Sequence, residues 1–175
     1  MSAAPRIDLE RFVPFRLNRL AAEVSRALAR VYGERFGIDI PEWRIIATLG
    51  DRGRARAQDV ALSTRMHKSM VSRAVARLTE LGWVARTDGA KDRREAPLAL
   101  TKAGREIYQQ LVPIVLDYQD RMLAGLSEGE RHMLERLLDK LERQLDLPCR
   151  PARPELRPRD AAAVLPEASR SGSAP

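Results

Sequence analysis

The chain has 175 residues, of which 44% are hydrophobic, enough for the core of one domain of ordinary size and not for two full domains. The formal net charge is +7, and residues 51–105 alone hold 13 basic and 6 acidic side chains. A basic middle between near-neutral or acidic flanks is typical of a polyanion-binding module on a scaffold, although scattered solvated charge is the alternative. Cys149 is the single cysteine, so an intrachain disulfide is excluded, and we interpret it as an incidental thiol rather than a redox sensor.

The first part of the chain predicts a flexible start over residues 1–8 and then a helix from Phe15. Apolar residues recur there at steps of three and four, on one helical stripe made of Leu17, Leu20, Val24, Leu28 and Val31. Gly33 and Gly37 are expected to interrupt the helix. The sequence shows no apolar signal core and no run near the roughly 18 apolar residues of a membrane span, so we expect a cytoplasmic protein without membrane contact.

A second helix is expected to start at Ile40-Pro41, because proline suits the first helical turn. Trp43, Ile46 and Leu49 form its apolar side, and residues 50–54 are interpreted as a turn. Residues 57–62 then predict a short helix that packs Val60 and Ala61 inward, and residues 63–66 a turn into the next helix.

The next helix, up to residue 81, has two contrasting faces. One is a stripe predicted to be buried, comprising Val71, Ala74, Val75, Leu78 and Leu81. The opposite face carries small and basic side chains: Lys68, Ser69, Ser72, Arg73, Ala76 and Arg77. This face has no long acidic side chain, and the small residues between its cations would let the backbone come close to a phosphate or a base edge.

A hairpin is predicted after that helix. Gly82 stands where a helix stops most easily in the left-handed conformation, and residues 83–87 and 98–100 have the composition of short strands. Between them lies DGAKDRRE, residues 88–95, with an Asp-Gly turn and a tip that carries Lys91, Arg93 and Arg94. Such a hairpin sets cations beside the helix, so that the helix suits a major groove and the hairpin a minor groove. Thr101 is a plausible cap of the following helix.

The C-terminal part predicts two amphipathic helices and a tail. The first continues through Pro113, which should bend it, and Ser127 with Glu130 forms a capping box for the second. The last helix carries a broad apolar stripe: Met133, Leu134, Leu137, Leu138, Leu141 and Leu145. One chain offers little for the stripes of the first and last helices to pack on, which predicts a homodimer, with a leucine-rich core of one chain as the alternative. Residues 148–175 hold 6 of the 11 prolines and predict a disordered tail.

Sites for enzymatic chemistry are not evident. The phosphate-cradling motifs G-x-x-x-x-G-K-[ST] and G-x-G-x-x-G and the nucleophile motif G-x-S-x-G do not occur. The two histidines, His67 and His132, have no neighbours at zinc spacing. We therefore expect no enzyme, no catalytic residue, no cofactor and no metal. The rival to DNA binding is a winged helix used as a protein-interaction module, but such helices usually expose apolar anchors.

These motifs resemble the MarR family of bacterial winged helix-turn-helix transcription regulators. The resemblance lies in SMVSRAVARLTELGWV, in the DRR tip at Asp92, Arg93 and Arg94, and in LTKAG before the next helix, and it spans about residues 9–147. It implies a mainly α fold with a small β-hairpin wing, a DNA-binding lobe over residues 41–104, and dimerisation helices over residues 9–40 and 105–147. His67 departs from the family pattern, since Asp or Ser is the commoner cap at the start of the recognition helix.

Site roles follow from the resemblance. It implies that Arg73 contacts a base or phosphate, that Arg93 enters a minor groove of double-stranded DNA, and that Asp92 helps to orient the wing. The expected operator is pseudo-palindromic, matching a two-fold homodimer. Lys68, Ser69, Ser72, Arg77, Lys91 and Arg94 complete the expected DNA-binding set.

A small-molecule effector is also implied by the resemblance. The stretches PFRLNRLAAEVS and IPEWRIIATLG are similar to the branch that governs aromatic-acid catabolism, so the ligand is expected to be an aromatic acid or an aromatic acyl-CoA thioester that releases a repressor from DNA. Phe15 and Trp43 would meet a ring, and Arg16, Arg19 and Arg44 an acidic group. The alternative is that Trp43 belongs to the core and the arginines to the solvated surface.

Overall fold

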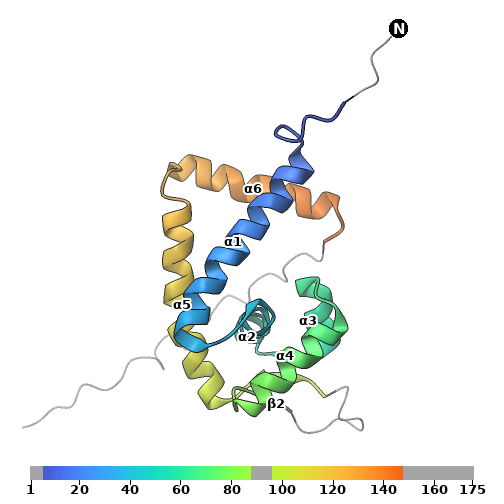
Figure 1. Cartoon of the computed structure of the whole chain (residues 1–175), viewed down its shortest axis with the longest axis vertical. Coiled ribbons are helices and arrows are strands. Elements are labelled where there is room, and N and C mark those ends of the chain that lie inside the picture. Colours follow the sequence, from blue (N-terminus) through green and yellow to red (C-terminus); the bar gives the residue numbers. More distant parts are fainter. Residues whose placement is uncertain (1–5, 88–95, 148–175) are drawn as a thin grey trace, which may run out of the picture. The chain divides into compact units, whose positions relative to one another are not determined.

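The computed structural model describes residues 6–87 and 96–147. Over these residues the chain forms, in order, α1 (Val13–Phe36), α2 (Ile40–Arg52), β1 (Arg54–Ala55), α3 (Ala57–Thr64), α4 (Lys68–Glu80), β2 (Val84–Arg86), β3 (Leu98–Leu100), α5 (Lys102–Met122) and α6 (Glu128–Gln144) (Figure 1). Two compact units divide between Ser127 and Glu128, so that α6 belongs to a unit of its own. The expectation of a mainly helical winged helix-turn-helix is confirmed for the first unit.

A three-stranded antiparallel sheet closes the base of the wing. β3 lies between β1 and β2, with Val84 opposite Leu100 and Arg54 opposite Ala99. The predicted turn over residues 50–54 is therefore wrong, since α2 continues to Arg52 and β1 follows at once. Gly53 makes this change of direction with a positive φ of 74°. The short helix α3 likewise runs two residues further than predicted, to Thr64.

The core of the first unit lies under α4. Its most deeply buried side chains come from seven elements: Tyr32 of α1, Ile45, Ile46 and Leu49 of α2, Val60 of α3, Val71 and Leu78 of α4, Val84 of β2, Leu98 of β3 and Leu111 of α5. The predicted stripe of α4 is confirmed at Val71, Ala74, Val75 and Leu78. It is wrong at Leu81, which is 41% exposed, because α4 ends at Glu80 and the chain turns away at Gly82. Gly82 has the predicted left-handed conformation, with a φ of 71°.

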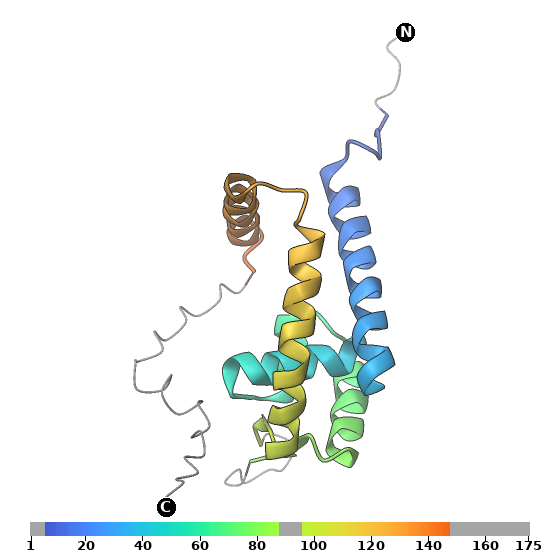
Figure 2. The same cartoon turned by 90° about the vertical axis from the view of Figure 1, so that its left-hand side faces the viewer.

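α1 is a single long helix. Gly33 does not interrupt it, because the chain keeps helical hydrogen bonding until Gly37, whose N–H donates to the Gly33 carbonyl at a φ of 63°. The C-terminal half of α1 packs against α2 and α5, and the views in Figure 1 and Figure 2 both show it beside these helices. Pro113 lies inside α5. The bend expected there stays a prediction.

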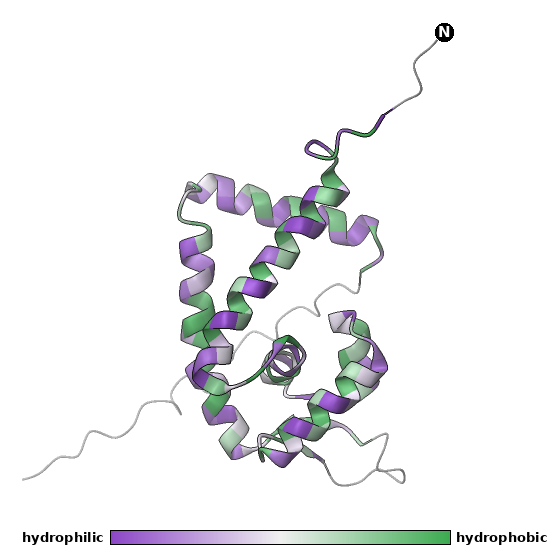
Figure 3. Ribbon diagram, in the orientation of Figure 1, coloured by the Kyte–Doolittle hydropathy of each residue, from purple (hydrophilic) through white to green (hydrophobic). Residues whose placement is uncertain are grey.

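The apolar stripes of α1 and α6 are only partly covered in the single chain. Val24, Leu28 and Val31 are half-buried, whereas Leu17 and Leu20 are exposed. On α6 no residue is buried, and the predicted stripe is exposed: Met133, Leu134, Leu137, Leu138 and Leu141. Leu145 is exposed as well, but its predicted place in the helix is wrong, because α6 ends at Gln144. Figure 3 shows hydrophobic residues alternating with hydrophilic ones along both helices. No helix among the described residues is long and apolar enough to cross a membrane.

Candidate nucleic-acid interface

The start of α4 is capped by a histidine ring. His67 adopts extended backbone geometry, and its Nδ1 accepts a hydrogen bond from the Ser69 N–H at 3.3 Å and lies 2.8 Å from the Ser69 hydroxyl oxygen. Imidazole thus takes the part that Asp or Ser oxygen usually plays at a helix start. His67 therefore still caps the helix, with a ring nitrogen as the acceptor in place of the side-chain oxygen of Asp or Ser.

The outward face of α4 carries the predicted small and basic side chains. Lys68, Ser69, Ser72 and Arg73 are all exposed on it. Arg73 forms no ion pair with any other described residue. Its guanidinium can therefore meet a phosphate or the edge of a guanine without first leaving a protein partner. Lys91, Asp92, Arg93 and Arg94 lie outside the described residues.

Arg77 differs from the other basic residues of this face. Its Nε lies 2.8 Å from Oε1 of Glu42 on α2, and its Nη2 donates to the carbonyl oxygen of Gly37, at the end of α1, at 3.3 Å. The predicted DNA contact at Arg77 is thus already engaged with the protein on two sides. The side chain is 56% exposed, so only its guanidinium end is tied down.

Glu42 is a buried charged residue beside this face that the sequence interpretation missed. It is buried, with 3% of its surface exposed, and it closes a capping box in which the Asp39 N–H donates to its Oε2 at 2.9 Å and its own N–H donates to Asp39 Oδ1 at 2.9 Å. The spacing D-x-x-E before an apolar run is a helix-start signal that could have found this box. The pairing with Arg77 has no signal in the sequence, because 35 positions separate the two residues.

The base of the wing is anchored to the start of α5. Thr101 caps α5 as predicted, because its hydroxyl oxygen accepts from the Gly104 N–H at 3.0 Å, and the same hydroxyl donates to the Gly82 carbonyl at 2.6 Å. On the hairpin side, the Thr87 N–H donates to the Pro97 carbonyl at 2.8 Å. The two strands that lead to the wing tip therefore begin in backbone that is hydrogen-bonded to the end of α4 and to the start of α5.

The five predicted effector residues fall into two groups. Trp43 stacks on buried Tyr32 at a ring-centroid distance of 5.7 Å, and Arg44 donates to the Thr64 carbonyl at 3.4 Å. Burial raises the pKa of Tyr32 to about 12. On α1, the Arg19 guanidinium lies over the Phe15 ring at 5.6 Å, and Arg16 and Arg19 line a cleft of about 400 Å³.

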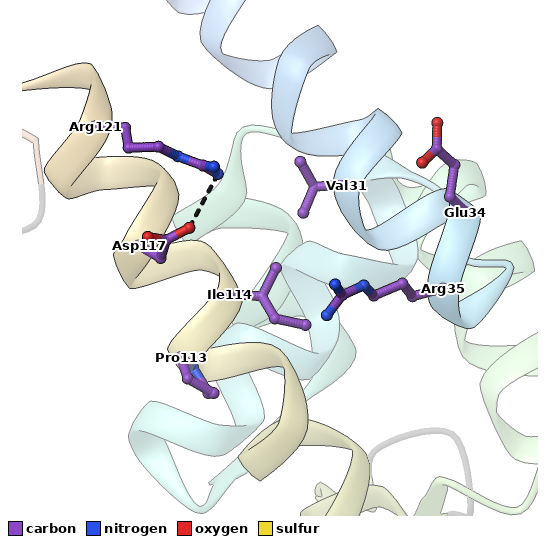
Figure 4. A pocket seen from close by; sticks show the side chains of 7 residues that line it. All are labelled: Val31, Glu34, Arg35, Pro113, Ile114, Asp117 and Arg121. Carbon is purple, nitrogen blue, oxygen red and sulfur yellow. Dashed lines mark ion pairs between the residues drawn. The ribbon is translucent and has the colours of Figure 1, made fainter.

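A second cleft, of about 390 Å³, lies between α1 and α5 (Figure 4). Its lining mixes apolar side chains with charged ones: Val31, Glu34, Arg35, Pro113, Ile114, Asp117 and Arg121. Figure 4 shows Arg35 reaching from α1 toward α5, and Arg121 pairs with Asp117 at 3.0 Å. The sequence interpretation missed this cleft, because its two walls are about 80 positions apart along the chain.

The geometry defines a class of protein. A short helix, a turn and an exposed cationic helix are followed by a hairpin whose base is fixed to the next helix, which is the arrangement of a winged helix-turn-helix that reads DNA. Among the described residues, no group of three or more His, Cys, Asp or Glu side chains is placed to hold a metal ion.

Comparison with known proteins narrows the class to a family. The sequence model of the MarR family matches residues 36–95. The regulator PecS of Dickeya dadantii is 27% identical over 145 residues, which cover 81% of this chain and 87% of PecS. The repressor IacR of Pseudomonas putida is 22% identical over 129 residues, 68% of this chain and 77% of IacR.

A solved structure shows the same relationship. The MarR/EmrR family regulator of Acinetobacter sp. ADP1 matches with a TM-score of 0.72 and 28% identity, covering 80% of this chain and 99% of that one. The sequence match, the relatives and the fold together support a winged helix-turn-helix regulator similar to the MarR family, whose members bind DNA and regulate transcription and are not enzymes.

Proposed function

We propose that this DNA-binding regulator is a homodimeric repressor, which reads a pseudo-palindromic operator through α4 and the wing and leaves it when a small acidic aromatic ligand binds. The observation that carries the proposal is the exposed face of α4, where Arg73 stands among small side chains without a protein partner in the described part of the chain. The relative IacR, named a transcriptional repressor, supports repression rather than activation.

The proposed DNA contacts divide into two sets. Lys68, Ser69, Ser72 and Arg73 on α4 would enter the major groove, and Lys91, Asp92, Arg93 and Arg94 in the wing would reach the backbone and the minor groove. Arg77 is left out of the first set because Glu42 and Gly37 already hold it. Direct base contacts carry sequence information, whereas phosphate contacts give affinity that depends on salt.

The DNA proposal is tested with Arg73→Ala. An operator duplex is first selected by the parent protein from a randomised pool. The variant should then lose roughly 1–3 kcal/mol of binding free energy per base contact and much of its preference over scrambled DNA. Arg30→Ala, which removes an exposed arginine on α1 away from α4 and the wing, serves as the control. Parental affinity and preference in Arg73→Ala, at matched salt and with an unchanged fold, would mean that α4 does not face DNA.

The dimer proposal rests on the exposed apolar residues of α1 and α6. An apolar stripe of this extent is unusual on a soluble monomer, since burying it in a partner gains about 25 cal/mol per Å². Sedimentation at micromolar concentration should give the dimer mass, and Leu137→Asp, at the middle of the α6 stripe, should shift it toward the monomer. A parent protein that sediments as a monomer over this range contradicts the two-fold operator as well.

The effector proposal has two possible locations on the first unit. The cleft on α1 offers Arg16 and Arg19, of which Arg19 lies over Phe15 and is also paired with Glu10 at 3.3 Å. The cleft between α1 and α5 offers Arg35 together with Val31 and Ile114. Each combines a guanidinium with apolar surface, which suits an aromatic carboxylate, and each volume is within the usual range for small ligands. Trp43 and Arg44 would act less directly, because they are held by Tyr32 and Thr64.

Aromatic acids and their CoA thioesters are screened by thermal shift and by loss of operator binding. For an active ligand, Arg19→Ala should abolish the shift if the α1 cleft binds it, and Arg35→Ala should do so if the α1–α5 cleft binds it. A ligand that stabilises the protein equally in both variants is bound elsewhere. If no aromatic acid or thioester acts on the parent protein, the proposed ligand class is wrong.

A further inference from the structure

The guanidinium of Arg77 forms a polar link between α4 and the rest of the first unit. It bonds two elements at once: the carboxylate of Glu42 in the first turn of α2, and the carbonyl of Gly37 that follows the last turn of α1. α2 also packs directly against α4 along the core. The orientation of α4 is therefore tied, through one side chain, to the place where α1 ends and α2 begins.

Breaking this link would cost free energy, because it would leave the buried carboxylate of Glu42 without its charged partner. The side chain of Glu42 is 4% exposed, and a buried charge without a partner is far less stable than one that is paired and hydrogen-bonded. One oxygen is satisfied by the Asp39 N–H and the other by Arg77. The planar guanidinium of Arg77 bonds two acceptors on different elements, Glu42 and Gly37, and two such bonds restrain rotation of α4 better than a single contact would.

We propose that Arg77 is a positioning residue, which sets operator affinity by fixing the recognition helix against the α1–α2 junction, and that it does not contact DNA. The proposal deepens the proposed function and rests on its claim that α4 faces DNA. Because α1 also carries part of the exposed apolar face assigned to the dimer, the Arg77–Glu42 pair connects the dimer helix to the reading helix.

Salt dependence separates a positioning residue from a phosphate contact. Each phosphate contact that is lost lowers the slope of log affinity against log salt by about 0.9, whereas a recognition helix that is only held less firmly keeps its phosphate contacts and therefore the slope. Glu42 is the matched partner, because a buried carboxylate on α2 cannot bind DNA. Both members of the pair should therefore give the same phenotype.

The experiment uses the full chain and a duplex selected by the parent protein from a randomised pool. Arg77→Ala and Glu42→Gln should each weaken binding roughly tenfold, within the usual range of coupling between sites, with the salt slope unchanged. The double variant should be no weaker than the worse single one, because both changes break the same link. Arg77→Lys should recover part of the loss, since an ammonium can reach one of the two acceptors.

A distance measurement reports the position of α4 directly. Spin labels at Glu34→Cys on α1 and Ala76→Cys on α4, both exposed, are placed in a Cys149→Ser background. The distance distribution should broaden when Arg77→Ala or Glu42→Gln is added. It should stay as narrow as in the parent with Arg73→Ala, which removes a guanidinium of the same helix that makes no such link.

The outcomes are distinct. The inference is wrong if Arg77→Ala lowers the salt slope while Glu42→Gln binds like the parent, because Arg77 is then a phosphate contact. It is also wrong if both variants keep parental affinity and a narrow distribution. If Arg73→Ala binds like the parent, α4 does not face DNA and the proposed function itself fails. Thermal denaturation of every variant shows that it is folded before these comparisons are made.

Discussion

Gly104→Ala tests the anchoring of the wing to α5. A methyl group at position 104 would overlap the backbone carbonyl of Trp83, which is fixed because it also accepts a hydrogen bond from the Thr101 N–H at 3.0 Å. A flexible side chain could swing aside, but a carbonyl inside a hydrogen-bonded frame cannot. The start of α5 must therefore move away from the strand that leads into the wing.

The size of the effect follows from three contributions. Overlap in a packed region costs about 1–3 kcal/mol or more, and loss of the hydrogen bond between Thr101 and Trp83 costs about 1 kcal/mol. Replacing glycine by alanine inside a helix contributes up to about 1 kcal/mol in the opposite sense. The net loss of unfolding free energy should be about 1–3 kcal/mol, or a decrease in Tm of about 2–12 °C.

Urea and thermal denaturation followed by circular dichroism measure this loss. Gly129→Ala is the matched control, because position 129 is also helical and nothing lies within 4 Å of the added methyl group. The control should be as stable as the parent protein or more stable by up to about 1 kcal/mol. If Gly104→Ala is also as stable as the parent, the close approach of α5 to Trp83 does not exist in solution, and the wing is anchored in some other way.

Three further predictions concern the cap, the core and the wing. His67→Ala should lower the unfolding free energy by about 0.5–2 kcal/mol in urea denaturation, and His67→Ser should restore it. Because burial raises the pKa of Tyr32 from 10.0 to about 12, its contribution to stability is complete below pH 10 and is lost as pH rises from 10 to 12; Tyr32→Phe should lack this loss, of roughly 2–3 kcal/mol, in alkaline denaturation. In titrations with operator variants, Arg93→Ala should weaken binding mainly at A·T-rich flanks, whereas Lys91→Ala should weaken all duplexes alike and lower the salt slope by about one. Equal losses at all flanks in both wing variants would contradict a minor-groove role for Arg93.

Much of the helix-turn-helix was predictable because its signals are local. The steps of three and four that place Val71, Val75 and Leu78 on one face depend only on helix geometry. Gly82 at the end of α4 and Thr101 at the start of α5 act through their own backbone conformation and nearest hydrogen bonds. Such features need no distant partner, so residue type and spacing determine them.

The errors occurred where distant residues decide the structure. β1 is two residues long and exists because β3, more than 40 positions later, pairs with it. Leu81 is apolar and stands at the right spacing for burial, but the direction of the chain after Gly82 leaves it exposed. Gly33 is compatible with an interruption and with a helix, and packing of α1 on α2 and α5 favours the helix.

The candidate site divides in the same way. The amphipathic pattern of α4 by itself determined that Arg73 and Arg77 share the exposed basic face, because a helix sorts side chains by period alone. Only the tertiary structure distinguished them: α2 brings the buried carboxylate of Glu42 to within 2.8 Å of Arg77, and no described residue pairs with Arg73 in this way. The physical reason is that a charge interacts with the groups that lie within a few ångströms of it in space, and residue order along a separation of 35 positions does not determine which groups will be that close.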